Sequence, residues 1–260
     1  MRGHWQQMLA LLTNEKTKPY ILALRAEFEA EGSRGEEVRQ LAHLAASAGL
    51  SLDLKIGGAE AVRDLHEAFI LGASRIIAPM IETPYALQKF VTAAKRVYQD
   101  HLSHVKLLIN IETITACQTF PDMLALPDMR HIFGVVIGRV DLAASMGLKR
   151  QDINAPVIFD LVQKTAAQAK EKGLAVVLGG AITVDALPFL SQFSPGCIDY
   201  LDTRKMALHY PLTAEQFTEA IDIATRFELL WLENKRDFHR AISTEDQTRI
   251  EMLKERSLAV

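Results

Sequence analysis

Two carboxylates follow two apolar runs of the sequence. The run LLINIE over 107–112 ends in Glu112, and the run GVVIGRVD over 134–141 ends in Asp141. Runs so rich in Val, Ile and Leu are typical of strands buried on both faces. Carboxylate oxygens suit Mg²⁺ or Mn²⁺, which also keeps water or substrate as ligands. Glu112 and Asp141 therefore predict a metal site, with helix capping as the alternative for each of them.

Charged side chains recur at the ends of five of the apolar runs. Along an extended chain, side chains alternate between two faces, so charges two residues apart share a face. Charges gathered at one end of a barrel are poorly solvated unless a cation and an anionic ligand balance them. The residues in step are Arg25, Glu27 and Glu29; Asp53 and Lys55; Asn110 and Glu112; Arg139 and Asp141; Asp202 and Arg204.

The elements that must position these residues alternate in type along the chain. Brief Val/Ile/Leu-rich runs are separated by stretches of helical period, which is the pattern of strand-helix-strand units. No run is followed by GxGxxG or a Walker loop, which disfavours nucleotide-binding doubly wound folds. We predict an α/β fold of the TIM-type (β/α) barrel class, with seven clear strands and an uncertain eighth. The seven runs are YILALRAEFEAEG, SLDLKIGG, SRIIAPMI, KLLINIE, IFGVVIGRVDL, LAVVLGGAI and CIDYLDTRKM.

The chain turns helical and highly charged from about residue 212 onward. We expect a barrel with an N-terminal helix over 1–211 and a C-terminal helical extension over 212–260. The extension exceeds what one barrel helix needs. It is expected to pack either on a neighbouring subunit, in a homo-oligomer, or on its own barrel.

The amino-acid composition and net charge limit the kinds of partner that the chain can bind. The formal charge of -3 gives no broad positive surface for nucleic acid or anionic lipid, so a small-molecule partner is expected. The two cysteines show no metal-like or disulfide spacing. The first apolar run is too short for a secretory signal, and no segment is long enough for a membrane span. These features predict a soluble cytoplasmic protein.

Several motifs together resemble the HpcH/HpaI aldolase and citrate lyase beta-subunit superfamily, whose members are pyruvate- or phosphoenolpyruvate-binding TIM barrels. The resemblance covers roughly residues 20–205. Its specific part is PMIET, then INIET, then GRVDLAASMG, whereas KIGG alone is weak. In chain order the matching pieces are AEFEAEG (26–32), LKIGG (54–58), IIAPMIET (76–83), INIET (109–113) and GVVIGRVDLAASMG (134–147).

The resemblance implies a role for each matching position. Glu112 and Asp141 would bind the divalent cation. Lys55, together with Gly57 of the same motif, would contact the carboxylate or carbonyl of the substrate. Gly138 and Ser145 would line the site of the metal-bound 2-oxo acid.

The sequence departs from the family pattern at three places. Lys55 stands where arginine is usual, and an ammonium cannot make the planar two-point contact of a guanidinium. The histidine base of the aldolase branch is missing, so Glu27 or Glu29 is the candidate catalytic acid or base. Arg139 replaces a small or acidic residue, and we expect it to make the pocket more cationic, to receive a second carboxylate or a phosphate.

Two further residues near the end of the barrel bear on the site. Arg204 is either an anion anchor opposite Lys55 or the ion-pair partner of Asp202, and the latter is slightly favoured. Of the histidines, only His209 is expected near the working face.

The resulting hypothesis is a Mg²⁺- or Mn²⁺-dependent carbon-carbon lyase or aldolase acting on a small 2-oxo acid, or on an acyl thioester such as an acyl-CoA. The metal would stabilise an enolate, and no Schiff base on Lys55 is required. One alternative is a non-catalytic or regulatory barrel that binds a dicarboxylate or phosphate. Another is phosphoenolpyruvate-type chemistry on the same scaffold.

Overall fold

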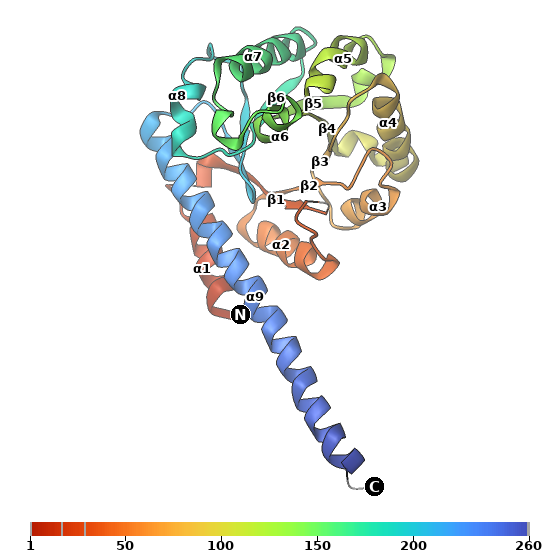
Figure 1. The fold of residues 1–260 in the computed structure, drawn as a ribbon, viewed down its shortest axis with the longest axis vertical. Coiled ribbons are helices and arrows are strands. Elements are labelled where there is room, and N and C mark those ends of the chain that lie inside the picture. The colour runs from red at the N-terminus through yellow and green to blue at the C-terminus, as the bar shows by residue number, and fades with distance from the viewer. Residues whose placement is uncertain (1, 17, 29, 259–260) are drawn as a thin grey trace.

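The computed structural model describes residues 2–16, 18–28 and 30–258. Within these residues eight strands close into a barrel in sequence order, and helices surround it (Figure 1). The predicted barrel class is thereby confirmed. The strands are β1 (Ile21–Glu27), β2 (Ser51–Lys55), β3 (Arg75–Ala78), β4 (Lys106–Ile111), β5 (Ile132–Gly138), β6 (Ala175–Gly179), β7 (Tyr200–Asp202) and β8 (Met206–His209). The helices are α1 (Arg2–Thr13), α2 (Gly35–Ala48), α3 (Val62–Ile70), α4 (Pro84–Tyr98), α5 (Ile114–Leu124), α6 (Arg139–Ser145), α7 (Pro156–Glu171), α8 (Leu187–Leu190) and α9 (Ala214–Leu258).

The uncertain eighth strand exists, and it runs the other way. Strands β1 to β7 pair in parallel, whereas β8 pairs antiparallel with both β7 and β1. Only residues 203–205 separate β7 from β8, and a parallel crossover needs about a dozen residues or more. The run CIDYLDTRKM therefore contains a hairpin turn.

This reversal corrects the expected position of His209. Because β8 is antiparallel, its last residue lies at the end where the parallel strands begin, with Tyr200 opposite His209. His209 is thus at the amino-terminal end of the barrel, far from the strand ends that carry Glu112 and Asp141.

Threonine side chains begin the two helices that follow the IET motifs. The Oγ1 atom of Thr83 accepts a hydrogen bond of 3.1 Å from the Ala86 amide at the start of α4. Thr113 accepts one of the same length from the Ala116 amide at the start of α5. Threonine is a favoured N-cap because its oxygen satisfies a free amide of the first turn. Thr113, and not Glu112, therefore caps the helix after β4.

The interior of the barrel is divided between an apolar and a charged part. Ile77, Leu108, Val136 and Val177 form a small buried cluster of their own inside the ring of strands. The main core lies between the strands and the surrounding helices. The charged part consists of Arg25, Asp53, Arg75 and Asp202, and it is described with the site below.

Helix α9 begins on the barrel and projects beyond it, with α1 alongside (Figure 1). Its first part buries Phe217, Phe227 and Trp231 against the barrel, whereas residues 242–251 are exposed. Among the described helices, none combines the length and apolar character that crossing a membrane requires.

Candidate active site

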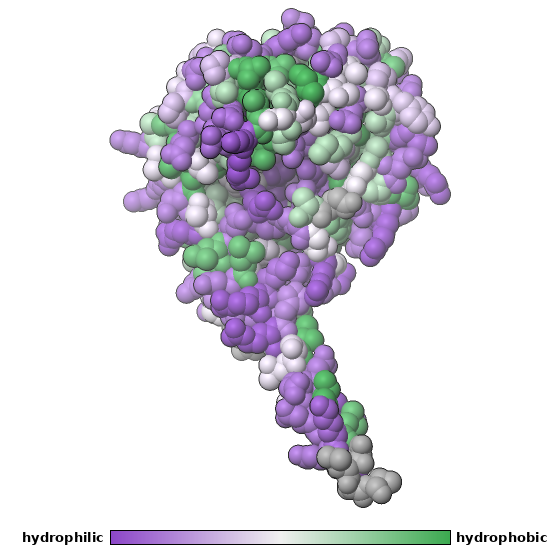
Figure 2. Space-filling view, in the orientation of Figure 1, coloured by the Kyte–Doolittle hydropathy of each residue, from purple (hydrophilic) through white to green (hydrophobic). Residues whose placement is uncertain are grey.

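A cavity of about 500 Å³ opens at the carboxyl-terminal ends of the parallel strands. Figure 2 shows a hollow in this face of the barrel, bordered largely by hydrophilic side chains. The strand ends contribute Lys55, Asn110, Glu112, Gly138, Asp141 and Arg204. Helix α9 covers one side with Ile221, Ala224, Thr225 and Glu228. In barrels of the (β/α) class this face is the usual place for catalysis.

Glu112 is a buried carboxylate that faces this cavity. Its side chain follows β4 directly and is 2% exposed. One carboxylate oxygen accepts a hydrogen bond of 2.7 Å from the Asn110 side-chain amide, and the other accepts one of 3.3 Å from the Met80 backbone amide. Because each carboxylate oxygen has two lone pairs, both oxygens keep capacity for a further ligand.

Asp141 brings a second negative charge close to Glu112. It lies in the first turn of α6, directly after β5, and it lines the same cavity. Burial raises the pKa of the Glu112 carboxyl above its ordinary value, and the charge of Asp141 raises it further, while Lys55 opposes both. A cation between the two carboxylates would relieve this repulsion.

Gly138 provides the space in which Glu112 lies. A Cβ atom at position 138 would be 2.8 Å from the Oε2 atom of Glu112, closer than van der Waals contact permits. The strand end beside Glu112 is therefore restricted to glycine unless the carboxylate moves.

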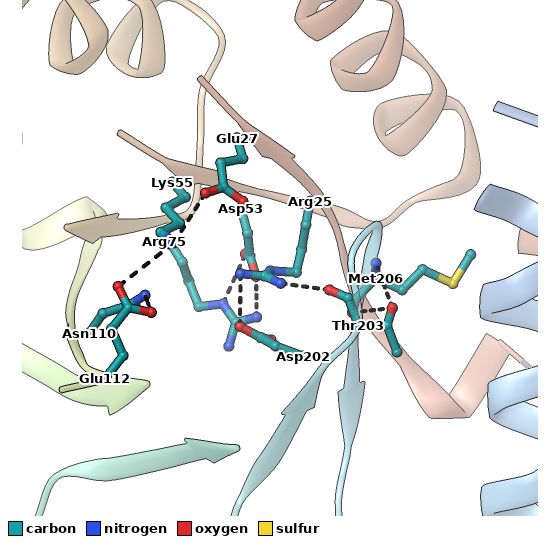
Figure 3. A network of polar contacts seen from close by, with 10 residues as sticks. All are labelled: Arg25, Glu27, Asp53, Lys55, Arg75, Asn110, Glu112, Asp202, Thr203 and Met206. Atoms are coloured by element: carbon teal, nitrogen blue, oxygen red, sulfur yellow. Dashed lines mark hydrogen bonds and ion pairs between the residues drawn. The ribbon is translucent and has the colours of Figure 1, made fainter. Parts of the chain in front are cut away.

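Lys55 lies between two carboxylates at the end of β2. Its Nζ atom is 3.1 Å from Oε1 of Glu27 and 3.9 Å from Oε1 of Glu112 (Figure 3). All three residues line the cavity. The ammonium group thus faces the cavity between Glu27 and Glu112, the second of which is a predicted metal ligand.

Four charged side chains form the floor beneath these groups. Arg75 on β3 binds both carboxylate oxygens of Asp53 on β2. Arg25 on β1 lies 3.0 Å from Oδ2 of Asp202 and donates to the Thr203 carbonyl (Figure 3). Arg25 and Asp202 also line the cavity, so the polar floor continues into it. Asp202 pairs with Arg25, which corrects the expectation that its partner is Arg204.

Arg139 has a different position from the one expected. Its side chain is fully buried and does not line the cavity. The guanidinium donates to the side chain of Asn154 and to the backbone carbonyls of residues 179–181, which span the end of β6 and the start of the loop after it. Burial lowers the pKa of Arg139 to about 10, so the group is still charged at neutral pH. Arg139 holds this loop in place. Its positive charge interacts with carbonyl oxygens of the chain and does not face the cavity, where a second acidic group of a substrate was expected.

The other predicted residues divide into those on the cavity and those beside it. Gly138 and Arg204 line it, and Arg204 lies 3.8 Å from Glu228 of α9. Gly57 does not line it, and its amide donates to Asp64. The hydroxyl of Ser145 bridges the Ile114 amide and the Leu142 carbonyl, away from the cavity. Glu29 lies outside the described residues.

Oxygen donors in the cavity fit a hard divalent cation. Glu112 and Asp141 offer carboxylates, and the Oδ1 atom of Asn110 is buried without a hydrogen-bond partner in the described part of the chain. Among the residues that the structure describes, no three His, Cys, Asp or Glu side chains form a group that could hold a metal ion. The carboxylate and amide oxygens in the cavity are of the kind that Mg²⁺ or Mn²⁺ takes, since such an ion needs only one or two carboxylates and completes its shell with water and substrate.

Sequence reasoning missed several residues of this site. Arg75 stands at the start of its strand, where a charge reads as a surface residue, and its pairing with Asp53 depends on register between β2 and β3. Arg25 was placed on the correct face but without its partner. The contribution of α9 had no local signal, since helix 214–231 reads as an ordinary amphipathic helix.

The fold and the cavity define a barrel with an enzyme-like site at the carboxyl ends of its strands. The family model for HpcH/HpaI aldolase/citrate lyase matches residues 41–186, which is more than half of the chain. The chain belongs to this family. A search of curated proteins found no match.

Solved structures with the same fold include members of the same family. An HpcH/HpaI aldolase/citrate lyase family protein from Burkholderia cenocepacia J2315 aligns with a TM-score of 0.58 and 19% identity over 72% of this chain and 80% of that one. An HpcH/HpaI aldolase from Desulfitobacterium hafniense DCB-2 aligns with a TM-score of 0.55 and 16% identity over 65% of this chain and 72% of that one. The citrate synthase SbnG aligns with a TM-score of 0.58 and 15% identity over 72% of this chain and 78% of that one. At these identities the likeness concerns the fold.

Proposed function

We propose that the chain is a divalent-metal-dependent carbon-carbon lyase or aldolase, acting on a small 2-oxo acid or an acyl thioester. The observation that carries the proposal is the convergence of Glu112, Asp141 and Lys55 on one cavity. Membership of the aldolase/citrate lyase family supports the reaction class.

Glu112 and Asp141 would hold Mg²⁺ or Mn²⁺. When bound there, the ion supplies electrostatic stabilisation of the negative charge that develops on the substrate when a bond next to its carbonyl group breaks. Asn110 orients the Glu112 carboxylate through the 2.7 Å hydrogen bond. Gly138 leaves room for that carboxylate.

Lys55 would bind the carboxylate of the substrate, and Glu27 would move the proton. In enolisation the carbon-hydrogen bond next to the carbonyl breaks, the proton passes to a carboxylate, and the electron pair shifts to the carbonyl oxygen. Glu27 lines the cavity and is 3.1 Å from Lys55, so the same ammonium group would align the base and the substrate. Glu29 remains a second candidate for the base.

Proton exchange on pyruvate tests the proposal without knowledge of the natural substrate. The purified chain is incubated with pyruvate in deuterated water, and loss of the methyl proton signal is followed by NMR. We expect exchange with MgCl₂ or MnCl₂ and none with EDTA. Absence of exchange with every divalent ion would contradict the proposal.

Glu112→Gln and Glu82→Gln form a matched pair of variants for this assay. Glu82 is the glutamate of the other IET motif, but its side chain accepts from the Thr113 hydroxyl and does not line the cavity. Exchange should be lost in Glu112→Gln and kept in Glu82→Gln. Equal loss in both would point to general damage to the fold.

We also propose that the chain forms a homo-oligomer through the projecting part of α9. Ile242, Ile250 and Leu253 on that part are each more than 40% exposed. A second copy would cover this surface. Light scattering after size-exclusion chromatography should give a multiple of 29.0 kDa, and a single-chain mass would contradict the proposal.

A further inference from the structure

A second cavity lies at the opposite end of the barrel, where the parallel strands begin. Its volume is about 180 Å³. A water molecule occupies about 30 Å³ in the liquid, so this space can hold a small ion with a few waters. The polar side chains that line it are Ser51, Ser74, Arg75, Ser103, His104 and Lys106.

The charge on the wall of this cavity is positive. Arg75 and Lys106 line it, and no Asp or Glu is found among its lining residues in the described part of the chain. Burial alone would lower the pKa of Arg75, but Asp53 holds it above the ordinary value, so the guanidinium is charged. Lys106 is exposed, lies 4.3 Å above the Phe133 ring, and forms no ion pair with any described residue.

Several hydrogen-bond donors at this cavity have no acceptor. The Nη1 atom of Arg75 is buried and unpaired within the described chain, although Nε and Nη2 both bind Asp53 (Figure 3). Arg75 itself is only 4% exposed. The hydroxyls of Ser51, Ser74 and Ser103 also make no hydrogen bond to the residues described, but Ser51 and Ser74 are half-buried and Ser103 is exposed, so these hydroxyls are open to water. The Nη1 atom of Arg75 is therefore the donor that carries the free-energy cost of being buried and unpaired, and an acceptor from outside the chain would recover that cost.

We propose that this cavity binds a phosphate group, either as inorganic phosphate or as the end of a small phosphomonoester. The donors come from four directions: β2, the residue before β3, β3 itself, and the segment 103–106 before and at the start of β4. A tetrahedral anion with three or four oxygens can accept from all of them, whereas a planar carboxylate has only two oxygens. The exposed edge formed by Ser103, His104 and Lys106 leaves the cavity open for entry.

Two histidines near the cavity can report on its occupancy. His104 lines it, and the His209 ring lies 5.9 Å from that of Tyr200, another lining residue. Burial lowers the pKa of His209, and the charge of Arg75 lowers it further. A bound anion beside Arg75 would offset that charge, so the imidazole resonances of His104 and His209 should move when phosphate binds.

The test is a titration of the full-length chain with inorganic phosphate, followed by NMR of the histidine ring protons at constant ionic strength. Three variants locate the site: Lys106→Met at this cavity, Lys55→Met at the other cavity, and Lys172→Met on the exposed surface. A parallel titration with glycerol phosphate distinguishes a phosphomonoester from free phosphate. Arg75 is left unchanged because its removal would leave the buried Asp53 carboxylate without its ion-pair partner.

We expect saturable shifts of His104 and His209, with Lys106→Met weakening phosphate binding about 10-fold or more, as for a hydrogen bond to a charged group. Lys55→Met and Lys172→Met should bind as the unmodified chain does. Tighter binding of glycerol phosphate would identify the phosphomonoester, and equal or weaker binding would identify free phosphate. The proposal is overturned if shifts do not saturate by about 10 mM, the millimolar range of the weakest specific ligands. It is equally overturned if Lys106→Met binds normally, or if only Lys55→Met loses binding.

Discussion

Replacing Arg75 by methionine isolates the buried ion pair beneath the cavity. Asp53 is fully buried, and both of its carboxylate oxygens are bound by Arg75. The Arg75→Met variant keeps an unbranched apolar side chain at this position and removes both hydrogen bonds at once. Asp53 is then left as a buried carboxylate, with Arg25 as a more distant positive charge.

The expected loss is large. Removing one partner of a buried pair costs about 3–5 kcal/mol, because the remaining charge keeps its desolvation cost without compensation. Removing both partners costs far less, since an apolar replacement of a buried pair is often neutral. We therefore expect the double variant Arg75→Met, Asp53→Leu to recover most of the stability, with a coupling free energy of about 2 kcal/mol or more.

Urea denaturation followed by circular dichroism measures these free energies in the unmodified chain, the two single variants and the double variant. The reasoning is refuted if Arg75→Met lowers the free energy of unfolding by less than about 1 kcal/mol, the range of an ordinary substitution. It is also refuted if the double variant loses the sum of the two single losses, because the pair would then be uncoupled.

Three further predictions concern the cavity at the carboxyl-terminal ends of the parallel strands. Lys55→Met should raise the KM for a 2-oxo acid about 10- to 100-fold, because one hydrogen bond to a charged group is lost. The surface variant Lys89→Met should leave this KM unchanged. Equal KM values for the two variants in steady-state kinetics would contradict the prediction. Because the folded-state pKa of Glu112 is raised, ionisation of this carboxyl costs stability as the pH rises through that pKa. Metal-free Glu112→Gln should therefore gain stability relative to the unmodified chain between mildly acidic and neutral pH in urea denaturation, and a constant difference would argue against a strained carboxylate. Gly138→Ala should displace the Glu112 carboxylate and weaken Mn²⁺ binding about 10-fold or more in calorimetry, and unchanged affinity would mean that the carboxylate adjusts freely.

The parts of the fold that were predictable have strong local signals. Seven runs of Val, Ile and Leu correspond to β1 to β7, because strands buried on both faces need such residues. The hairpin into β8 was not predictable in direction, since LDTRKM contains neither Gly nor Pro at its turn over 203–205. That missed reversal also misplaced His209.

The site shows the same limit. The position of Glu112 and Asp141 at strand ends follows from sequence, because parallel strands bring their carboxyl ends together. The partners of charged residues do not follow from it. Asp202 pairs with Arg25, some 180 residues away in the chain, and Arg139 turns back into the loop after β6. Such pairings depend on register and loop path, which no local pattern encodes.

Electron paramagnetic resonance of Mn²⁺ measures most directly whether Glu112 and Asp141 hold a divalent ion. Free Mn²⁺ gives a sharp signal that is lost on binding, so a titration of the full-length chain yields affinity and stoichiometry. We predict one Mn²⁺ per chain. The affinity for Mn²⁺ should fall about 100-fold or more in Glu112→Gln and in Asp141→Asn, because losing a direct ligand should matter at least as much as losing an outer hydrogen-bond partner. The affinity should be unchanged in Glu82→Gln. Mn²⁺ that stays free at saturating concentration, or that binds Glu112→Gln as tightly as the unmodified chain, would contradict the account.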